Sequence, residues 1–173
     1  MVQMVERLVP INDSLNPEGV TTFMMAAGVC SANELQLLMP FGPDVLAVDR
    51  CGRTALHFAC RAGNLEAFNF LIEFENLDYD AVTSAGVTPL MNAVQSENQD
   101  LVQRCLQSNL NPFLKDALGR TARDYTQFCG VVARSGINNM IDQAINQWME
   151  QSSEEDRTGY QQSFSAHFND FSL

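Results

Sequence analysis

Hydrophobic residues along this chain recur at helical spacing. Between positions 65 and 72 one face carries Leu65, Phe68, Leu71 and Ile72, which is the 3.6-residue period of a half-buried helix. Near the C-terminus one apolar stripe is formed by Ile137, Met140, Ile141, Ala144, Ile145 and Trp148. This stripe predicts a long final helix, which we expect to follow an insertion over residues 131–136.

A short block of glycine and threonine occurs four times. Its glycines are 33, 34 and 33 residues apart, at Gly19, Gly52, Gly86 and Gly119. Two residues after each glycine stands a threonine, namely Thr21, Thr54, Thr88 and Thr121. Each threonine is placed to cap a helix through its side-chain oxygen, and Pro89 suits the first helical position after one of them. One helix pair cannot bury its apolar face alone, so neighbouring copies must stack.

Residues 49–63 carry a family resemblance. Their sequence, DRCGRTALHFACRAG, resembles the ankyrin repeat opening D-x-x-G-x-T-P-L-H-x-A-A-x-x-G, with Ala55 in the proline place and Cys60 in the second alanine place. GVTPLMNAV at 86–94 resembles the same opening, and GPDVLAVD at 42–49 and NPFLKD at 111–116 resemble the closing half. The resemblance implies an all-α ankyrin-repeat solenoid of about four helix-turn-helix repeats with hairpin-like loops.

The repeat spacing divides the chain into three parts. We expect an N-terminal capping helix or partial repeat over 1–18, an ankyrin repeat domain over 19–151, and an acidic and aromatic tail over 152–173. Within the domain, repeats are expected at about 19–49, 50–83, 84–116 and 117–151. The tail is either disordered or docks on the solenoid or a partner. In the second case its rings fall at helical-turn spacing, at Tyr160, Phe164, Phe168 and Phe171.

Charge and composition narrow the classes of partner. The chain has 21 acidic and 10 basic residues, a net charge of −11, which disfavours nucleic acid and anionic membrane surfaces. No apolar run approaches the roughly 20 residues of a membrane span, so no direct membrane insertion is expected. The N-terminus resembles no leader peptide, and the five cysteines form no CxxC pair. These features predict reduced thiols in the cytoplasm, with cytoskeletal, ciliary or organelle-complex association also compatible.

Catalytic and metal chemistry find little support. Cys51, His57 and Cys60 have the spacing C-x5-H-x2-C, which is no standard zinc spacing. In the resemblance His57 instead occupies the family's histidine position, where it serves the repeat turn. No phosphate-binding loop, HExxH or GxSxG motif occurs, so we expect no enzyme, no cofactor and no metal.

The resemblance implies that protein partners meet the concave side, made by the hairpin tips and first helices. The solenoid residues predicted there are Arg50, Arg53, Arg61, Val87, Gln95, Arg120 and Arg123, and the tail rings Tyr160, Phe164, Phe168 and Phe171 join the predicted protein-binding set. The arginines have two interpretations. They are ordinary scaffold residues, partly neutralised by Asp49 and Asp116, or they bind carboxylates of a partner's acidic segment, which the planar guanidinium pairs bidentately.

The function predicted from these features is a non-catalytic protein-protein interaction module or adaptor. The alternative is a permanently bound structural subunit of a large assembly, such as a cytoskeletal, ciliary or respiratory complex, anchored by its tail.

Overall fold

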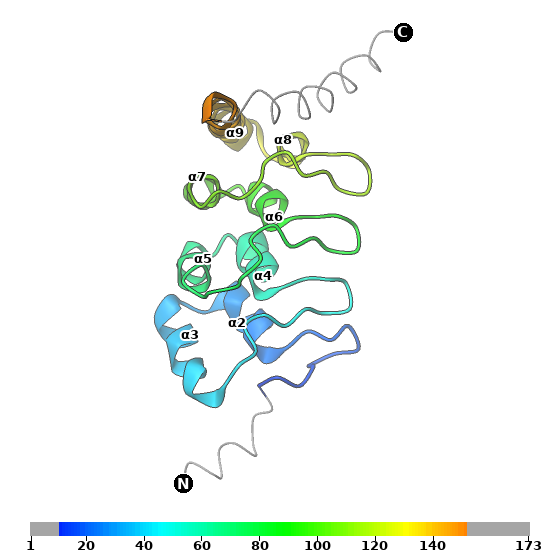
Figure 1. The fold of residues 1–173 in the computed structure, drawn as a ribbon, viewed down its shortest axis with the longest axis vertical. Coiled ribbons are helices and arrows are strands. Elements are labelled where there is room, and N and C mark those ends of the chain that lie inside the picture. The colour runs from blue at the N-terminus through cyan, green and yellow to red at the C-terminus, as the bar shows by residue number, and fades with distance from the viewer. Residues whose placement is uncertain (1–10, 152–173) are drawn as a thin grey trace.

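The computed structural model describes residues 11–151 as a stack of helix pairs (Figure 1). The first helices of the pairs are α2 (Thr22–Val29), α4 (Ala55–Ala62), α6 (Pro89–Gln95) and α8 (Ala122–Tyr125). The second helices are α3 (Ala32–Leu38), α5 (Leu65–Leu71), α7 (Gln99–Gln107) and α9 (Val131–Gln151). Short 3-10 helices, η1 (Met39–Phe41) and η2 (Thr126–Phe128), follow α3 and α8. No strand is present within 11–151, and the predicted all-α repeat solenoid is confirmed.

Each first helix begins where its threonine predicts. Thr21 Oγ1 accepts a hydrogen bond from the Met24 amide at 3.3 Å, and Thr88 Oγ1 accepts from Met91 at 3.2 Å. Thr54 and Thr121 occupy the same N-cap place in α4 and α8. These bonds satisfy amides that a helix N-terminus otherwise leaves free, so the helix register is set locally.

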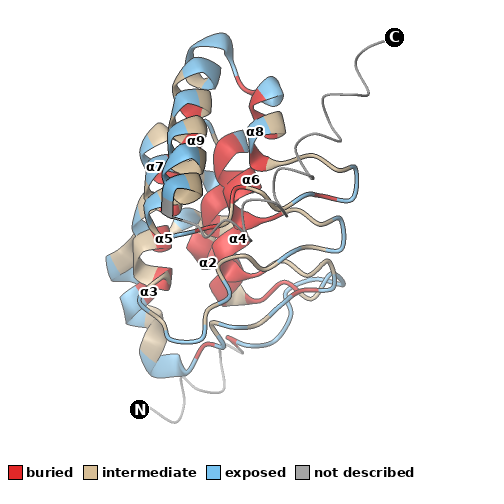
Figure 2. Ribbon diagram, turned by 45° about the horizontal axis from the view of Figure 1, so that its top comes forward, coloured by how far each residue is buried: buried red, intermediate tan, exposed pale blue. Residues whose placement is uncertain are grey.

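The core runs along the stack between the two rows of helices. Its centre consists of the first helices, because α4 and α6 are covered by a neighbour on either side (Figure 2). Leu56 and Leu90 are fully buried in this row, and Leu71 and Leu101 meet them from the second helices. Burying one leucine contributes about 2 kcal/mol. Each helix pair is therefore stabilised mainly by contact with its neighbours.

The loops before the first helices form hairpins that project from one side of the stack (Figure 1). Three residues before each repeat glycine, an oxygen-bearing side chain accepts backbone amides of its own turn; these residues are Asn16, Asp49, Thr83 and Asp116. Neighbouring hairpins are then joined by single backbone bonds of 2.8 Å, from Arg50 N to Glu18 O, Ser84 N to Cys51 O and Ala117 N to Ala85 O. The hairpins therefore stack in register with the helices.

The last helix differs from its expected start. α9 begins at Val131, so residues 131–136, expected as an insertion, are its first turns. Gly136 lies close to the Gln99 side chain of α7, and a Cβ there would be 2.9 Å from it. A glycine at this position therefore leaves room for the first turns of α9 beside α7. Ile137 and Ile141 of the predicted stripe are fully buried. The expected N-terminal capping helix and the C-terminal tail fall mostly or wholly on 1–10 and 152–173, outside the described residues.

Candidate functional site

A groove lies between the second and third repeats, on the side of the hairpins and first helices. Its volume is about 280 Å³, and the residues lining it include Phe58 and Arg61 of α4, Asn92 of α6, and Ser84 and Val87 of the third hairpin. Arg61 is exposed, Phe58 is half-buried and Asn92 is buried. The groove thus combines a cation, an aromatic ring and a carboxamide on a surface that the stack preforms.

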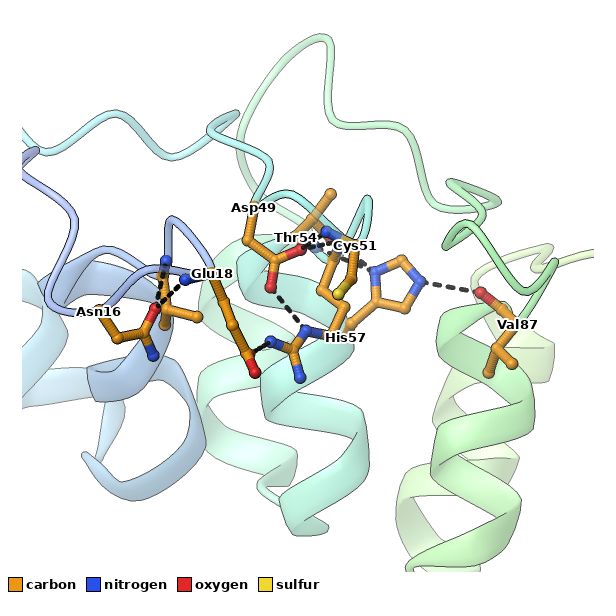
Figure 3. Close-up of polar contacts among 9 residues, drawn as sticks. Asn16, Glu18, Asp49, Cys51, Thr54, His57 and Val87 are labelled. Atoms are coloured by element: carbon orange, nitrogen blue, oxygen red, sulfur yellow. Dashed lines mark hydrogen bonds and ion pairs between the residues drawn. The ribbon is translucent and has the colours of Figure 1, made fainter.

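Arg53 approaches this groove but is occupied within the protein. Its Nε lies 2.6 Å from Asp49 Oδ2 and its Nη2 lies 2.5 Å from Glu18 Oε2. The two carboxylates belong to neighbouring hairpins and face each other across their interface (Figure 3). The hydrogen bond to Asp49 is the main cause that raises the pKa of Arg53. The guanidinium also lies 5.1 Å from the Phe58 ring centroid. Arg53 therefore links the first two repeats.

Arg120 repeats the arrangement in the fourth unit. Its Nη2 lies 2.6 Å from Asp116 Oδ2, and its guanidinium stacks over the rings of Tyr125 and Phe128 at 4.9 and 5.5 Å. Tyr125 also donates its hydroxyl to Asp116 at 2.9 Å. Burial alone raises the pKa of Asp116, but the bonds from Arg120, Tyr125 and the Leu118 amide outweigh it and hold the pKa below its usual value. Asp116 is thus a charged anchor for the hairpin.

The other predicted arginines divide into two kinds. Arg123 pairs with Asp142 of α9 at 2.7 Å, so its side chain joins α8 to the last second helix. Arg50 and Arg61 are exposed, and neither side chain makes an ion pair or hydrogen bond with a described residue. Gln95 is exposed at the end of α6. Of the predicted residues, the groove brings together Arg53, Arg61 and Val87, and the four tail rings lie outside the described residues.

His57 connects two repeats. The Thr54 amide can only donate, so the His57 Nδ1, 3.2 Å away, accepts, and Nε2 carries the proton toward Val87 O at 3.1 Å (Figure 3). Burial lowers the pKa of His57, which keeps the ring neutral. Burial also raises the pKa of the Cys60 thiol, on the same helix α4, well above its usual value. With both ring nitrogens engaged, His57 serves the repeat turn, as the resemblance implies.

Residues 11–151 offer neither a metal-binding cluster nor a membrane-spanning helix. Within that range no group of three His, Cys, Asp or Glu side chains is arranged to hold a metal ion. Of the helices described there, none is both long enough and apolar enough to cross a membrane.

Asn92 is a site residue that the sequence analysis does not single out. It is 5% exposed and lines the groove from the middle of α6. The sequence contains a signal for Asn92 in its position within the repeat. Asn92 follows the capping threonine of GVTPLMNAV by four residues, and the corresponding residue of GRTALHFAC is Phe58. The second repeat has an apolar side chain at this position, so a carboxamide in the third repeat is an exception among the first helices.

Stacked helix pairs, hairpins along one edge and a groove between adjacent units define a repeat protein that offers an extended preformed surface. The family model for ankyrin repeats (3 copies) matches residues 1–83, and in the structure the same unit continues through α6–α7 and α8–α9. The chain belongs to the ankyrin repeat family.

Two of three similar proteins are themselves named as ankyrin repeat proteins. Human ankyrin repeat domain-containing protein 63 is 38% identical over 85 residues, covering 47% of this chain and 22% of that protein. The putative ankyrin repeat protein YahD of Escherichia coli strain K12 is 29% identical over 50% of this chain and 46% of its own length. The neurogenic locus notch homolog protein 1 of Xenopus tropicalis is 24% identical over 84% of this chain and 6% of its own. The chain therefore spans less than half the length of these relatives. Ankyrin repeats are in general protein-protein interaction modules and typically not catalytic.

Proposed function

We propose that this chain is a non-catalytic protein-binding module that takes an acidic segment of a partner against its concave surface. By concave surface we mean the hairpins together with α2, α4, α6 and α8. The observation that carries the proposal is the contrast among the arginines. Arg53, Arg120 and Arg123 are each paired with a carboxylate, whereas Arg50 and Arg61 are exposed without a partner among residues 11–151.

The chemistry of these two arginines favours a carboxylate ligand. An unpaired guanidinium offers a planar fork of donors that fits a carboxylate bidentately. Arg50 stands at the tip of the second hairpin and Arg61 in the last turn of α4, so both belong to the concave surface. Because the stack holds this surface in place before binding, little conformational entropy is lost when a partner segment docks.

Selection from a random dodecapeptide display library on the immobilised full-length chain tests the proposal. We expect the selected peptides to be enriched in Asp and Glu. Titration should then show that their affinity falls about tenfold or more in Arg50→Gln/Arg61→Gln, since one charge-assisted hydrogen bond is worth about 1.5–3 kcal/mol. The dependence of affinity on salt concentration should also become flatter.

A matched control separates a local effect from net charge. Gln36 and Gln103 are exposed on α3 and α7, on the side of the second helices. Gln36→Glu/Gln103→Glu makes the chain more negative by the same two charges as the arginine variant, and we expect it to bind almost normally. Selected peptides without acidic residues, or equal binding to the two double variants, would overturn the proposal.

We further infer a reducing cytoplasmic location. All five cysteines are free thiols, and Cys60, Cys105 and Cys129 are buried, which is typical of a protein that is not stabilised by disulfides. Imaging of the tagged full-length chain should show cytoplasmic signal, and signal confined to the secretory pathway would contradict this.

A further inference from the structure

Asn92 is an exception among the buried polar residues of the structure. Within residues 11–151 eight polar or charged residues are buried: Thr21, Asp49, Thr54, His57, Thr88, Asn92, Asp116 and Thr126. Seven of them use their side chains in hydrogen bonds inside the protein. The carboxamide of Asn92 makes none with any described residue. A buried unsatisfied amide costs about 1–3 kcal/mol, so its presence in the core row requires a reason.

Asn92 lines the groove together with groups of the third hairpin and of α4. Two backbone groups of hairpin residues that line the groove are already used, because Val87 O accepts from His57 and Ser84 N donates to Cys51 O. On the opposite wall stand Phe58 and Arg61 of α4. Phe58 offers an apolar ring and Arg61 an exposed cation. A ligand in this groove would therefore meet an amide, a ring and a guanidinium together.

We propose that Asn92 binds the main chain of the partner segment and so fixes it as an extended peptide between α4 and α6. This inference rests on the proposed function and specifies its ligand. A carboxamide supplies one acceptor oxygen and two donor hydrogens, which match the C=O and N–H groups of a peptide backbone. Arg61 then pairs with an Asp or Glu side chain of the same segment. The ligand class is an extended acidic peptide, bound by backbone at Asn92 and by carboxylate at Arg61.

The variant Asn92→Leu tests this inference, because leucine has nearly the same shape and lacks the polar atoms. If the amide is unpaired in the free protein, its removal raises Tm by a few degrees. If the amide also holds the peptide main chain, the same variant binds the tightest dodecapeptide of the display selection about tenfold more weakly. Higher stability with lower affinity is a result that a folding defect does not produce.

Backbone-methylated versions of that dodecapeptide locate the contact. N-methylation at the residue facing Asn92 removes one backbone donor, so it should weaken binding to the unmodified protein and have a much smaller effect on Asn92→Leu. Unchanged affinity of Asn92→Leu, or equal losses from every methylation in both proteins, would overturn the role of Asn92. The proposed function fails separately, if no acidic peptide is selected or if Arg50→Gln/Arg61→Gln binds normally.

Discussion

At the scale of single residues, polar side chains with long-range partners join one repeat to the next. His57 bonds forward to Val87 O, and Nδ2 of Asn98, the N-cap of α7, bonds back to Gly63 O at 2.8 Å. Arg53 connects Asp49 with Glu18 of the preceding hairpin. The bonds of His57, of Asn98 and of Arg53 with Glu18 cross a boundary between repeats, whereas Asp49 and Arg53 belong to one turn. Polar side chains that the sequence suggests for binding or chemistry are therefore largely occupied in holding the stack together.

The buried neutral His57 predicts a pH-dependent stability. Because burial lowers its pKa in the folded state, the unfolded chain binds the proton more readily. The free energy of unfolding should therefore be fully retained above the ordinary histidine pKa of about 6.5 and fall below it, by at most about 1.4 kcal/mol for each pH unit. Urea titrations between about pH 8 and pH 5.5 measure this slope.

The third repeat shows which residue can replace His57 in a control for this prediction. Met91 stands in the equivalent place of the third repeat, where its sulfur lies 3.4 Å from the Thr88 amide. His57→Met should fill the same space without a titrating group, and its stability should vary less between these pH values. Equal pH slopes in the two proteins would show that His57 is not the source.

At the scale of elements, the hairpins depend on glycines with a left-handed backbone. The space around these glycines differs from one repeat to the next. Gly86 has φ +73°, and a Cβ there would lie 2.9 Å from Ala117 N and Asp116 Cα of the next hairpin. Gly119 has φ +76°, and a Cβ there would have nothing within 4 Å. The difference arises because another described hairpin follows the third one and none follows the fourth within residues 11–151.

This pair of glycines separates backbone strain from hairpin stacking. Gly119→Ala should lower the free energy of unfolding by about 1–2 kcal/mol, the cost of a left-handed alanine. Gly86→Ala should lower it by more, because it also displaces the next hairpin and its 2.8 Å bond from Ala117 N to Ala85 O. Chemical denaturation of both variants compares the two costs. A Gly119→Ala protein as unstable as Gly86→Ala would contradict the stacking argument.

At the scale of the whole molecule, each helix pair is stabilised by its neighbours, since it contacts mainly the helix pairs beside it in the stack. α9 covers α7 at the C-terminal side, and its residues Ile137 and Ile141 are fully buried. By contrast, Val132 on the same helix is 87% exposed. The helix thus has one apolar face that closes the stack.

Shortening that face should loosen the last repeat selectively. Ile141→Ala should lower the free energy of unfolding by about 2–5 kcal/mol through the lost burial and the cavity that remains. Hydrogen exchange should rise most in α8 and α9 and least in α2 and α3, because coupling acts between nearest neighbours. Val132→Ala is the matched control and should change little. Uniform loss of protection along the chain would indicate one cooperative unit instead.

Local sequence determined the repeats of this protein and the places where its helices begin. Thr21, Thr54, Thr88 and Thr121 cap helices within their own segments, and the Asp49–Arg53 and Asp116–Arg120 pairs lie four residues apart. Such interactions can be read from spacing because both partners belong to one turn. The start of α9 was less readable, since its first turns make contacts that spacing does not reveal: Gly136 lies against Gln99 of α7, and Arg134 donates to the carbonyl oxygens of Thr126, Gln127 and Cys129.

Only the tertiary structure decided which polar groups remain available. Glu18 and Arg53 are 35 residues apart, and Arg123 and Asp142 are 19 apart, yet stacking brings them into contact and neutralises two of the predicted binding arginines. The same stacking buries Asn92 without a side-chain hydrogen bond to any of residues 11–151, and it leaves Arg61 exposed in the same groove. The physical reason is that pairing between distant side chains depends on which surfaces the stacked repeats place opposite each other, and spacing along the chain carries little of that information.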